Sequence, residues 1–112
     1  AMPRSTEMVG LAIGESAWVT VPGELQTRLG QAIKARGRRL FPVAFVVGLS
    51  NDYLGYFLAP AEFDTRGYIA CAALYGEEGG QRLVDRAGWC CPVVLARRWW
   101  AWRPWPRCGR IR

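Results

Sequence analysis

The segment FPVAFVVGL, from Phe41 to Leu49, is an almost unbroken apolar run rich in Val and Phe. Such a run is typical of a strand that is covered on both faces, as in the sheet of an α/β protein. The residues that follow it, Ser50-Asn51-Asp52, favour a turn. Because ligands of open α/β sheets bind at the carboxyl ends of strands, we expect a functional site directly after this run.

The residues before this run predict a hairpin and then a helix. Two β-rich stretches, Met8 to Ile13 and Ala17 to Val21, are separated by the turn residues Gly14-Glu15. After Pro22-Gly23-Glu24 the apolar spacing becomes helical, and Gly37 is a candidate C-cap. A strand, a helix and a strand in this order predict a right-handed crossover and a parallel strand pair. The apolar stripe of the helix consists of Leu25, Leu29, Ala32 and Ile33.

Further helices are expected after the turn. Pro60 at a first helical position predicts a short helix, and Glu77-Glu78 predict the start of a longer one, with acidic residues at the positive end of its dipole. The small, apolar stretch from Tyr68 to Tyr75 fits either a strand or a buried helix. The expected fold class is therefore α/β, an incomplete mixed sheet with covering helices. The chain enters strand-like sequence almost at once, as a piece of a larger domain would.

Length and charge indicate one small domain with a distinct tail. The chain has 112 residues and a net charge of +6. Residues 1–86 hold nine basic and nine acidic residues, whereas residues 87–112 hold six Arg and no acid. We therefore expect a neutral α/β region over 1–86 and a basic Trp/Arg/Pro-rich tail over 87–112. The chain contains no His, which excludes a Ser-His-Asp triad, a His-Cys dyad and a His-rich metal cage within it.

The tail allows two interpretations. The stretch from Trp99 to Arg107 alternates Trp and Arg with Pro, which suits contact with an anionic membrane surface. An alternative function for the chain is thus a non-catalytic α/β module with a membrane-interacting tail. The same residue types all use GC-rich codons, so an unstructured or frame-shifted tail is the other interpretation. We expect no nucleic-acid partner.

No targeting or membrane-spanning segment is visible in the sequence. The residues at its start lack the charged and apolar regions of a signal peptide, and the longest apolar stretch, Leu40 to Leu49, is shorter than the roughly 20 residues that a membrane helix needs. The sequence thus assigns no compartment. No two of the four cysteines have the spacing of a zinc knuckle or a redox motif, which leaves both free thiols and a structural bridge open.

Three features could carry chemistry: Glu24, the segment NDYLGYF from Asn51 to Phe57, and Tyr68. Each also has an ordinary structural explanation, as a residue that offsets a helix dipole, a turn, or the edge of a core. Their order, however, resembles the neutral/alkaline ceramidase family. The motifs that carry this resemblance are Val19-Thr20-Val21-Pro22-Gly23-Glu24, Gly48-Leu49-Ser50-Asn51-Asp52-Tyr53-Leu54-Gly55-Tyr56, Ala59-Pro60-Ala61-Glu62-Phe63, Gly67-Tyr68 and Leu74-Tyr75-Gly76.

The resemblance implies a fragment of a larger α/β hydrolytic domain. Enzymes of this family are zinc amidases of sphingolipid metabolism that cleave the N-acyl bond of ceramide. The family pattern implies that Glu24 and Tyr56 are zinc ligands and that Tyr68, twelve positions after Tyr56, is a catalytic residue that contacts the scissile amide. It implies zinc as cofactor and a lipid amide as substrate. The two His ligands and the Ser nucleophile of the family lie upstream, so we expect this chain to be inactive alone.

The sequence departs from the family pattern around these residues. Ala59 stands where the family usually has Thr, Ala61-Glu62-Phe63 replaces Glu-Glu-Tyr, and Ile69 replaces a Glu. These differences remove hydroxyl and carboxylate groups near the expected site. Family membership is therefore a firmer expectation than the identity of the amide.

Overall fold

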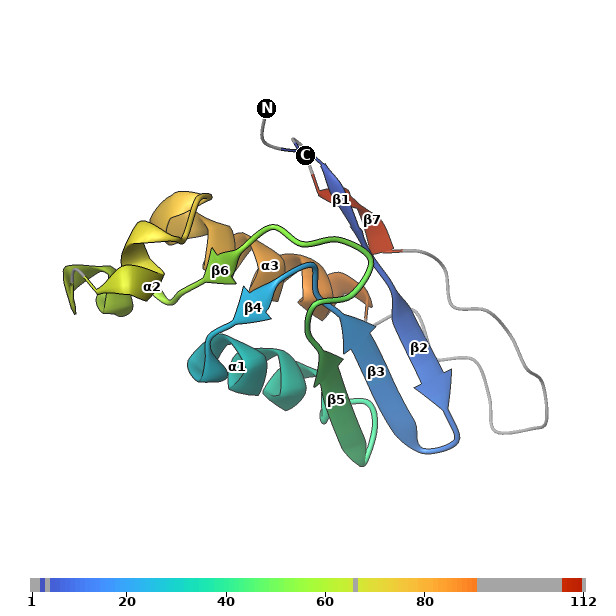
Figure 1. Cartoon of the computed structure of the whole chain (residues 1–112). Helices are drawn as coiled ribbons and strands as arrows, with labels where there is room; N and C mark the ends of the chain where they lie inside the picture. The colour runs from blue at the N-terminus through green and yellow to red at the C-terminus, as the bar shows by residue number, and fades with distance from the viewer. Residues whose placement is uncertain (1–2, 4, 66, 91–107, 112) are drawn as a thin grey trace.

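The structure is a computed structural model that describes residues 3, 5–65, 67–90 and 108–111 (Figure 1). It is an α/β arrangement of short strands and helices, which confirms the expected fold class. The strands are β1 (Thr6–Met8), β2 (Gly10–Ile13), β3 (Ser16–Thr20), β4 (Glu24–Leu25), β5 (Val43–Val47), β6 (Tyr56–Phe57) and β7 (Cys108–Ile111). The helices are α1 (Thr27–Gly37), the 3-10 helix η1 (Pro60–Thr65), α2 (Tyr68–Cys71) and α3 (Gly76–Cys90).

The largest sheet has the strand order β2-β3-β5. Strands β2 and β3 form the predicted antiparallel hairpin, with Gly14 at a φ of 57° in its turn. Strands β3 and β5 are parallel over their full lengths, in a register that runs from Ser16 beside Val43 to Thr20 beside Val47. Helix α1 connects them, so the predicted strand-helix-strand unit with a parallel pair is confirmed.

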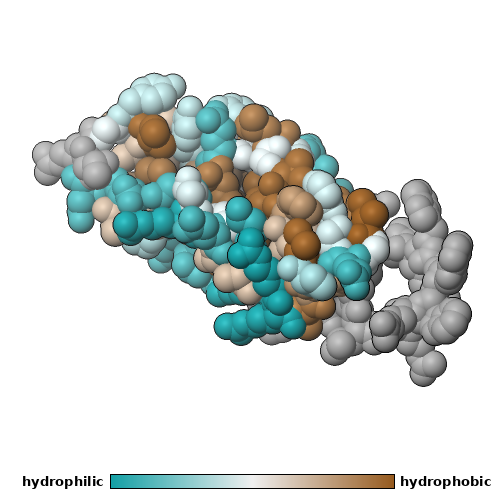
Figure 2. All heavy atoms as spheres, turned by 90° about the horizontal axis from the view of Figure 1, so that it is seen from below, coloured by the Kyte–Doolittle hydropathy of each residue, from teal (hydrophilic) through white to brown (hydrophobic). Residues whose placement is uncertain are grey.

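The expectation that β5 is covered on both faces is wrong. Ala44 is buried, whereas Val43, Phe45 and Val47 alternate with it and are exposed. Strand β5 is the outer strand of the sheet, and the helices pack on one face of it. Among the described residues, no second layer covers the other face of β5. Figure 2 shows hydrophobic residues at the surface over the part of the molecule where β5 and the β2–β3 hairpin lie.

The core lies between the helix-facing side of this sheet and helices α1 and α3. Leu29 and Ile33 of α1 are buried there, as their spacing predicts, while Leu25 precedes the helix in β4. Gly37 is not the C-cap. It is the last helical residue, and its carbonyl accepts hydrogen bonds from the amides of Leu40 and Phe41, so the turn tightens and the right-handed Arg38 caps the helix. The other buried members of the core are Met8, Val19, Val21, Leu54, Phe57, Leu83, Val84 and Ala87.

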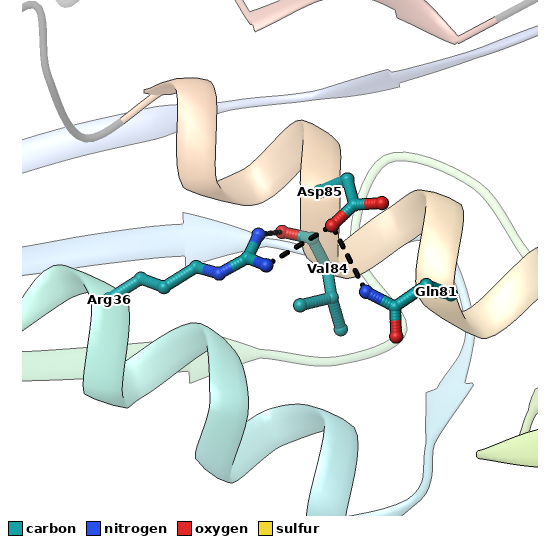
Figure 3. Close-up of polar contacts among 4 residues, drawn as sticks. All are labelled: Arg36, Gln81, Val84 and Asp85. Atoms are coloured by element: carbon teal, nitrogen blue, oxygen red, sulfur yellow. Dashed lines mark hydrogen bonds and ion pairs between the residues drawn. The ribbon is translucent and has the colours of Figure 1, made fainter.

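A polar clamp joins α1 to α3 (Figure 3). The guanidinium of Arg36 donates to the carbonyl oxygen of Val84 at 2.8 Å and to Oδ1 of Asp85 at 3.1 Å. The amide of Gln81 donates to the same Asp85 oxygen at 3.0 Å. These bonds fix how the two helices pack and therefore support the core beneath the sheet.

The region after β6 is helical. Pro60 begins the predicted short helix, η1, and Glu77 and Glu78 lie in the first turn of α3, again as predicted. The stretch from Tyr68 to Tyr75 is neither a strand nor a buried helix: it forms α2 and a turn, and no residue of α2 is buried. In the part of the chain that the structure describes, no helix has the length and apolarity to cross a membrane.

Little of the expected tail is described. Helix α3 continues to Cys90, past the expected boundary between residues 86 and 87, and residues 108–111 form β7, which pairs antiparallel with β1. The Trp/Arg-rich stretch from Trp99 to Arg107, and with it the expected membrane contact, lies outside the described residues. Cys71 is a free, exposed cysteine.

Candidate functional site

A second parallel strand pair lies just beyond the carboxyl ends of β3 and β5 (Figure 1). In this pair, Glu24 of β4 lies beside Tyr56 of β6. The amide of Glu24 donates to the carbonyl oxygen of Gly55 at 2.9 Å, and the amide of Gln26 donates to that of Phe57 at 3.0 Å. Backbone bonds alone therefore place two of the expected site residues next to each other, although they are far apart in the chain.

Gly23 permits this close approach of the two strands. A Cβ atom at Gly23 would collide with the carbonyl oxygen of Gly55 and would lie 2.9 Å from the ring of Phe57. Gly55 itself has a φ of 80°, a backbone angle that residues with a side chain rarely adopt. The glycines of the Pro-Gly-Glu and Leu-Gly-Tyr motifs are thus required by the packing that brings Glu24 to Tyr56.

Asn51 fastens the loop that carries the tyrosines. Its Nδ2 donates to Oγ1 of Thr20 at 2.9 Å and to the carbonyl oxygen of Glu7 at 3.2 Å. Thr20 Oγ1 also accepts from the amide of Val9 at 2.7 Å. Asn51 has a φ of 71°, a left-handed conformation that Asn tolerates better than most residues. The loop is therefore held against the end of β3, four residues before Glu24.

The Glu24 carboxylate interacts with the phenol groups of Tyr53 and Tyr56. The hydroxyl of Tyr53 donates to Oε1 of Glu24 at 3.1 Å. This hydrogen bond is the main cause of a raised pKa of Tyr53, with desolvation and the charge of Glu24 adding to it. Desolvation is the main cause of the raised pKa of Tyr56, followed by the charge of Glu24 and a hydrogen bond to it. The surroundings of both phenols therefore favour their protonated form.

Tyr68 is the first residue of α2, and its ring contacts the ring of Tyr56. The two rings meet edge to face, with their centroids 6.2 Å apart and an angle of 76° between their planes. Tyr68 is 77% exposed, so it lies at the surface rather than in the core. The structure thus brings all three sequence-derived residues, Glu24, Tyr56 and Tyr68, into one cluster at the surface.

The sequence analysis does not single out two residues that support this cluster, although both occur in the family motifs. Tyr53 makes the direct hydrogen bond to Glu24, and Thr20 accepts a hydrogen bond from Asn51 of the loop. The signal for Tyr53 was its place in the loop, two residues after the left-handed Asn51. No pattern in the sequence distinguishes the Thr20 hydroxyl as the acceptor that anchors this loop.

The donor set does not make a complete zinc site. Zinc takes about four N, S or O ligands, and this cluster offers one carboxylate and neighbouring phenols. Within the described residues, no group of three or more His, Cys, Asp or Glu could hold a metal ion. The residues present thus match at most half of the ligand set that the family resemblance implies.

Comparison with known proteins finds a distant relationship to two curated proteins of Dictyostelium discoideum. The chain is 29% identical to neutral ceramidase B and 28% identical to neutral ceramidase A, in both cases over 72 residues that cover 59% of this chain. It spans only about a tenth of the length of either relative. No protein-family model matches the chain, and no solved structure does. The chain therefore contains a region that is distantly related to neutral ceramidases.

Proposed function

We propose that this chain is part of a ceramidase-type zinc amidase, which hydrolyses the N-acyl amide of ceramide or a related lipid amide. The observation that carries the proposal is the clustering of Glu24, Tyr56 and Tyr68, three residues from distant parts of the chain. The distant relationship to the two neutral ceramidases supports it. Because the donor set is incomplete, the chain is inactive alone and contributes one side of a larger site.

In this proposal, Glu24 and Tyr56 are two of the zinc ligands, and the remaining ligands come from another segment of the enzyme. Zinc, when bound, supplies a Lewis acid and an acidified water molecule. The chain itself positions the ligands: the Tyr53 hydroxyl holds Oε1 of Glu24, and backbone pairing holds Tyr56 beside it. A cation at this place would oppose the charge of Glu24, which adds to desolvation in raising the pKa of Tyr56.

Tyr68 has the exposure and the position to meet a substrate. Its ring meets that of Tyr56 edge to face, and the residue as a whole is largely exposed to solvent. A phenol in this place can donate a hydrogen bond to the carbonyl oxygen of an amide, which gains negative charge during attack. Tyr68 is thus the proposed catalytic residue that this chain supplies.

The test is a chimera in which the matching region of this chain replaces the corresponding 72 residues of Dictyostelium neutral ceramidase B. Zinc content and hydrolysis of an N-acyl sphingoid substrate are measured on the purified protein. We expect Glu24→Gln and Tyr56→Phe to lower both, and Tyr68→Phe to keep zinc but lower kcat by about 100-fold.

Glu15→Gln is the matched control, because Glu15 is an exposed carboxylate in the hairpin turn. It should leave zinc content and hydrolysis unchanged. A chimera that keeps its zinc and its activity with Glu24→Gln would overturn the assignment of Glu24. Hydrolysis by the isolated 112-residue chain would overturn the claim that its site is incomplete.

A further inference from the structure

The face of the β2-β3-β5 sheet opposite the helices is largely apolar. We call it the open face. Its apolar residues are between 36% and 55% exposed, apart from Trp18, which is half-buried. The register aligns Leu11, Trp18 and Phe45 in one row across all three strands. The apolar residues of the open face are Leu11, Ile13, Trp18, Val43, Phe45 and Val47, and the polar, half-buried Ser16 and Thr20 of β3 lie on the same face.

Two aromatic side chains stack on each other at the centre of the open face. Trp18 and Phe45 stack with their centroids 4.2 Å apart and an angle of 24° between the ring planes. The indole N–H of Trp18 donates to Oγ of Ser16 at 2.9 Å, so its one polar atom is satisfied within the chain. The open face contains no charged residue. Its chemistry therefore suits an apolar protein layer rather than a charged partner.

The length of the matched relatives indicates where such a layer comes from. Parallel strand pairs such as β3–β5 are normally covered on both faces, and among the residues that the structure describes helices cover one of them. The two neutral ceramidases are about ten times as long as their match to this chain. A ceramidase-type chain thus has ample further sequence to form the second layer.

The position of the open face relative to the site supports the same source. Strand β3 leads into β4 with Glu24, and β5 leads into β6 with Tyr56. A layer on the open face therefore lies near the cluster that lacks ligands. We infer that the open face is the docking surface for the remaining part of a ceramidase-type catalytic chain. This inference rests on the proposed function and adds the surface through which the site is completed.

The test is association in trans. The 112-residue chain is mixed with Dictyostelium neutral ceramidase B or A from which the 72 matching residues have been deleted. Binding is measured by sedimentation velocity, and hydrogen exchange follows the amides of residues 43–47. We expect a complex in which these amides gain protection, and we expect Phe45→Lys to weaken binding by about tenfold or more.

Leu74→Lys is the matched control, because Leu74 is also an exposed apolar residue but follows α2, outside the open face. It should change binding by less than about twofold. Both substitutions are at exposed positions, and circular dichroism of each variant checks that its fold is intact. Glu24→Gln should leave association unchanged while it abolishes hydrolysis by the complex.

Three results would overturn the inference. The first is the absence of association with both deleted ceramidases, and the second is association that Phe45→Lys leaves intact. The third is a homodimer of the 112-residue chain that Phe45→Lys dissociates, which would assign the open face to a second copy. Hydrolysis by the complex that survives Glu24→Gln would instead refute the proposed function and leave the docking surface standing.

Discussion

The two parallel strand pairs of this protein differ in length and in the side chains that they carry. The β3–β5 pair is five residues long on each strand and buries Val19 and Ala44 against the helices. The β4–β6 pair is two residues long, and its first members are the half-buried Glu24 and Tyr56. Buried side chains support the first pair along its length, whereas in the second pair Phe57 is buried in the core and backbone hydrogen bonds with a close glycine contact place Glu24 beside Tyr56. The second pair is thereby free to present polar side chains at the surface.

The largest expected effect comes from removing the close contact of the β4–β6 pair. Gly23→Ala should lower the free energy of unfolding by about 3 kcal/mol, because the new methyl group meets backbone and a packed ring. Urea denaturation measures this change. Gly48→Ala is the control, because a Cβ atom there makes only an ordinary contact of 3.4 Å, and it should have little effect. Equal losses for both variants would contradict the packing argument.

The β3–β5 pair can be tested by the same substitution on its two faces. Val19→Ala should cost about 2 kcal/mol, because it leaves a cavity on the side that the helices cover. Val47→Ala, on the open face, should cost less than about 1 kcal/mol. Thermal or urea unfolding compares the two. A greater loss for Val47→Ala would mean that the open face is already covered in the isolated chain.

The loop between the two pairs should respond more weakly. Asn51→Ala removes two hydrogen bonds and places at a φ of 71° a residue that tolerates the left-handed conformation less well than Asn, so we expect a loss of about 1.5 kcal/mol. Asn51→Gly removes the same hydrogen bonds but keeps the backbone conformation accessible, and it should cost less. If the glycine variant is the less stable of the two, the left-handed conformation is not the source of the difference.

The smallest effect concerns pH. Tyr53, Tyr56 and Tyr75 have pKa values raised above their ordinary 10.0, so the folded state keeps protons that the unfolded state releases. The stability that they contribute is therefore present below pH 10.0 and is lost as the pH rises through the folded pKa values. Urea midpoints between about pH 8 and pH 11 should show this fall.

Glu24→Gln should reduce the alkaline fall, because it removes the charge that disfavours the phenolates of Tyr53 and Tyr56. Absorbance of the ionised tyrosines, followed against pH, should shift toward lower pH in the same variant. Glu15→Gln, in the exposed hairpin turn, should change neither measurement. Identical titrations of all three proteins would show that Glu24 does not act on these phenols.

Local patterns in the sequence predict most of the first strand pair and little of the second. Alternation and helical spacing identify the hairpin, α1 and the parallel pair, because these elements bury apolar residues at regular intervals. The prediction that β5 is covered on both faces is wrong, because an apolar run does not reveal whether a second layer covers the strand. The β4–β6 pair has only two residues per strand, too few for any periodicity.

The site residues are likewise visible from the sequence only through family motifs. Nothing in the spacing of Glu24, Tyr56 and Tyr68 predicts that they meet, because their contact depends on the parallel register and on Gly23. Tyr53 and Thr20 add the hydrogen bonds that hold the cluster, and both depend on the left-handed turn at Asn51. Such contacts are properties of the folded backbone rather than of local residue preference.

Helix α1 has a consequence for the order of folding. As the crossover between β3 and β5, it lies within the same chain loop that separates β4 from β6. Once β3 and β5 have paired, most of the entropy of closing that loop is already lost, and β4 meets β6 through two short remaining connections. We therefore expect Glu24 and Tyr56 to come together after the larger sheet has formed, at a small further loss of chain entropy.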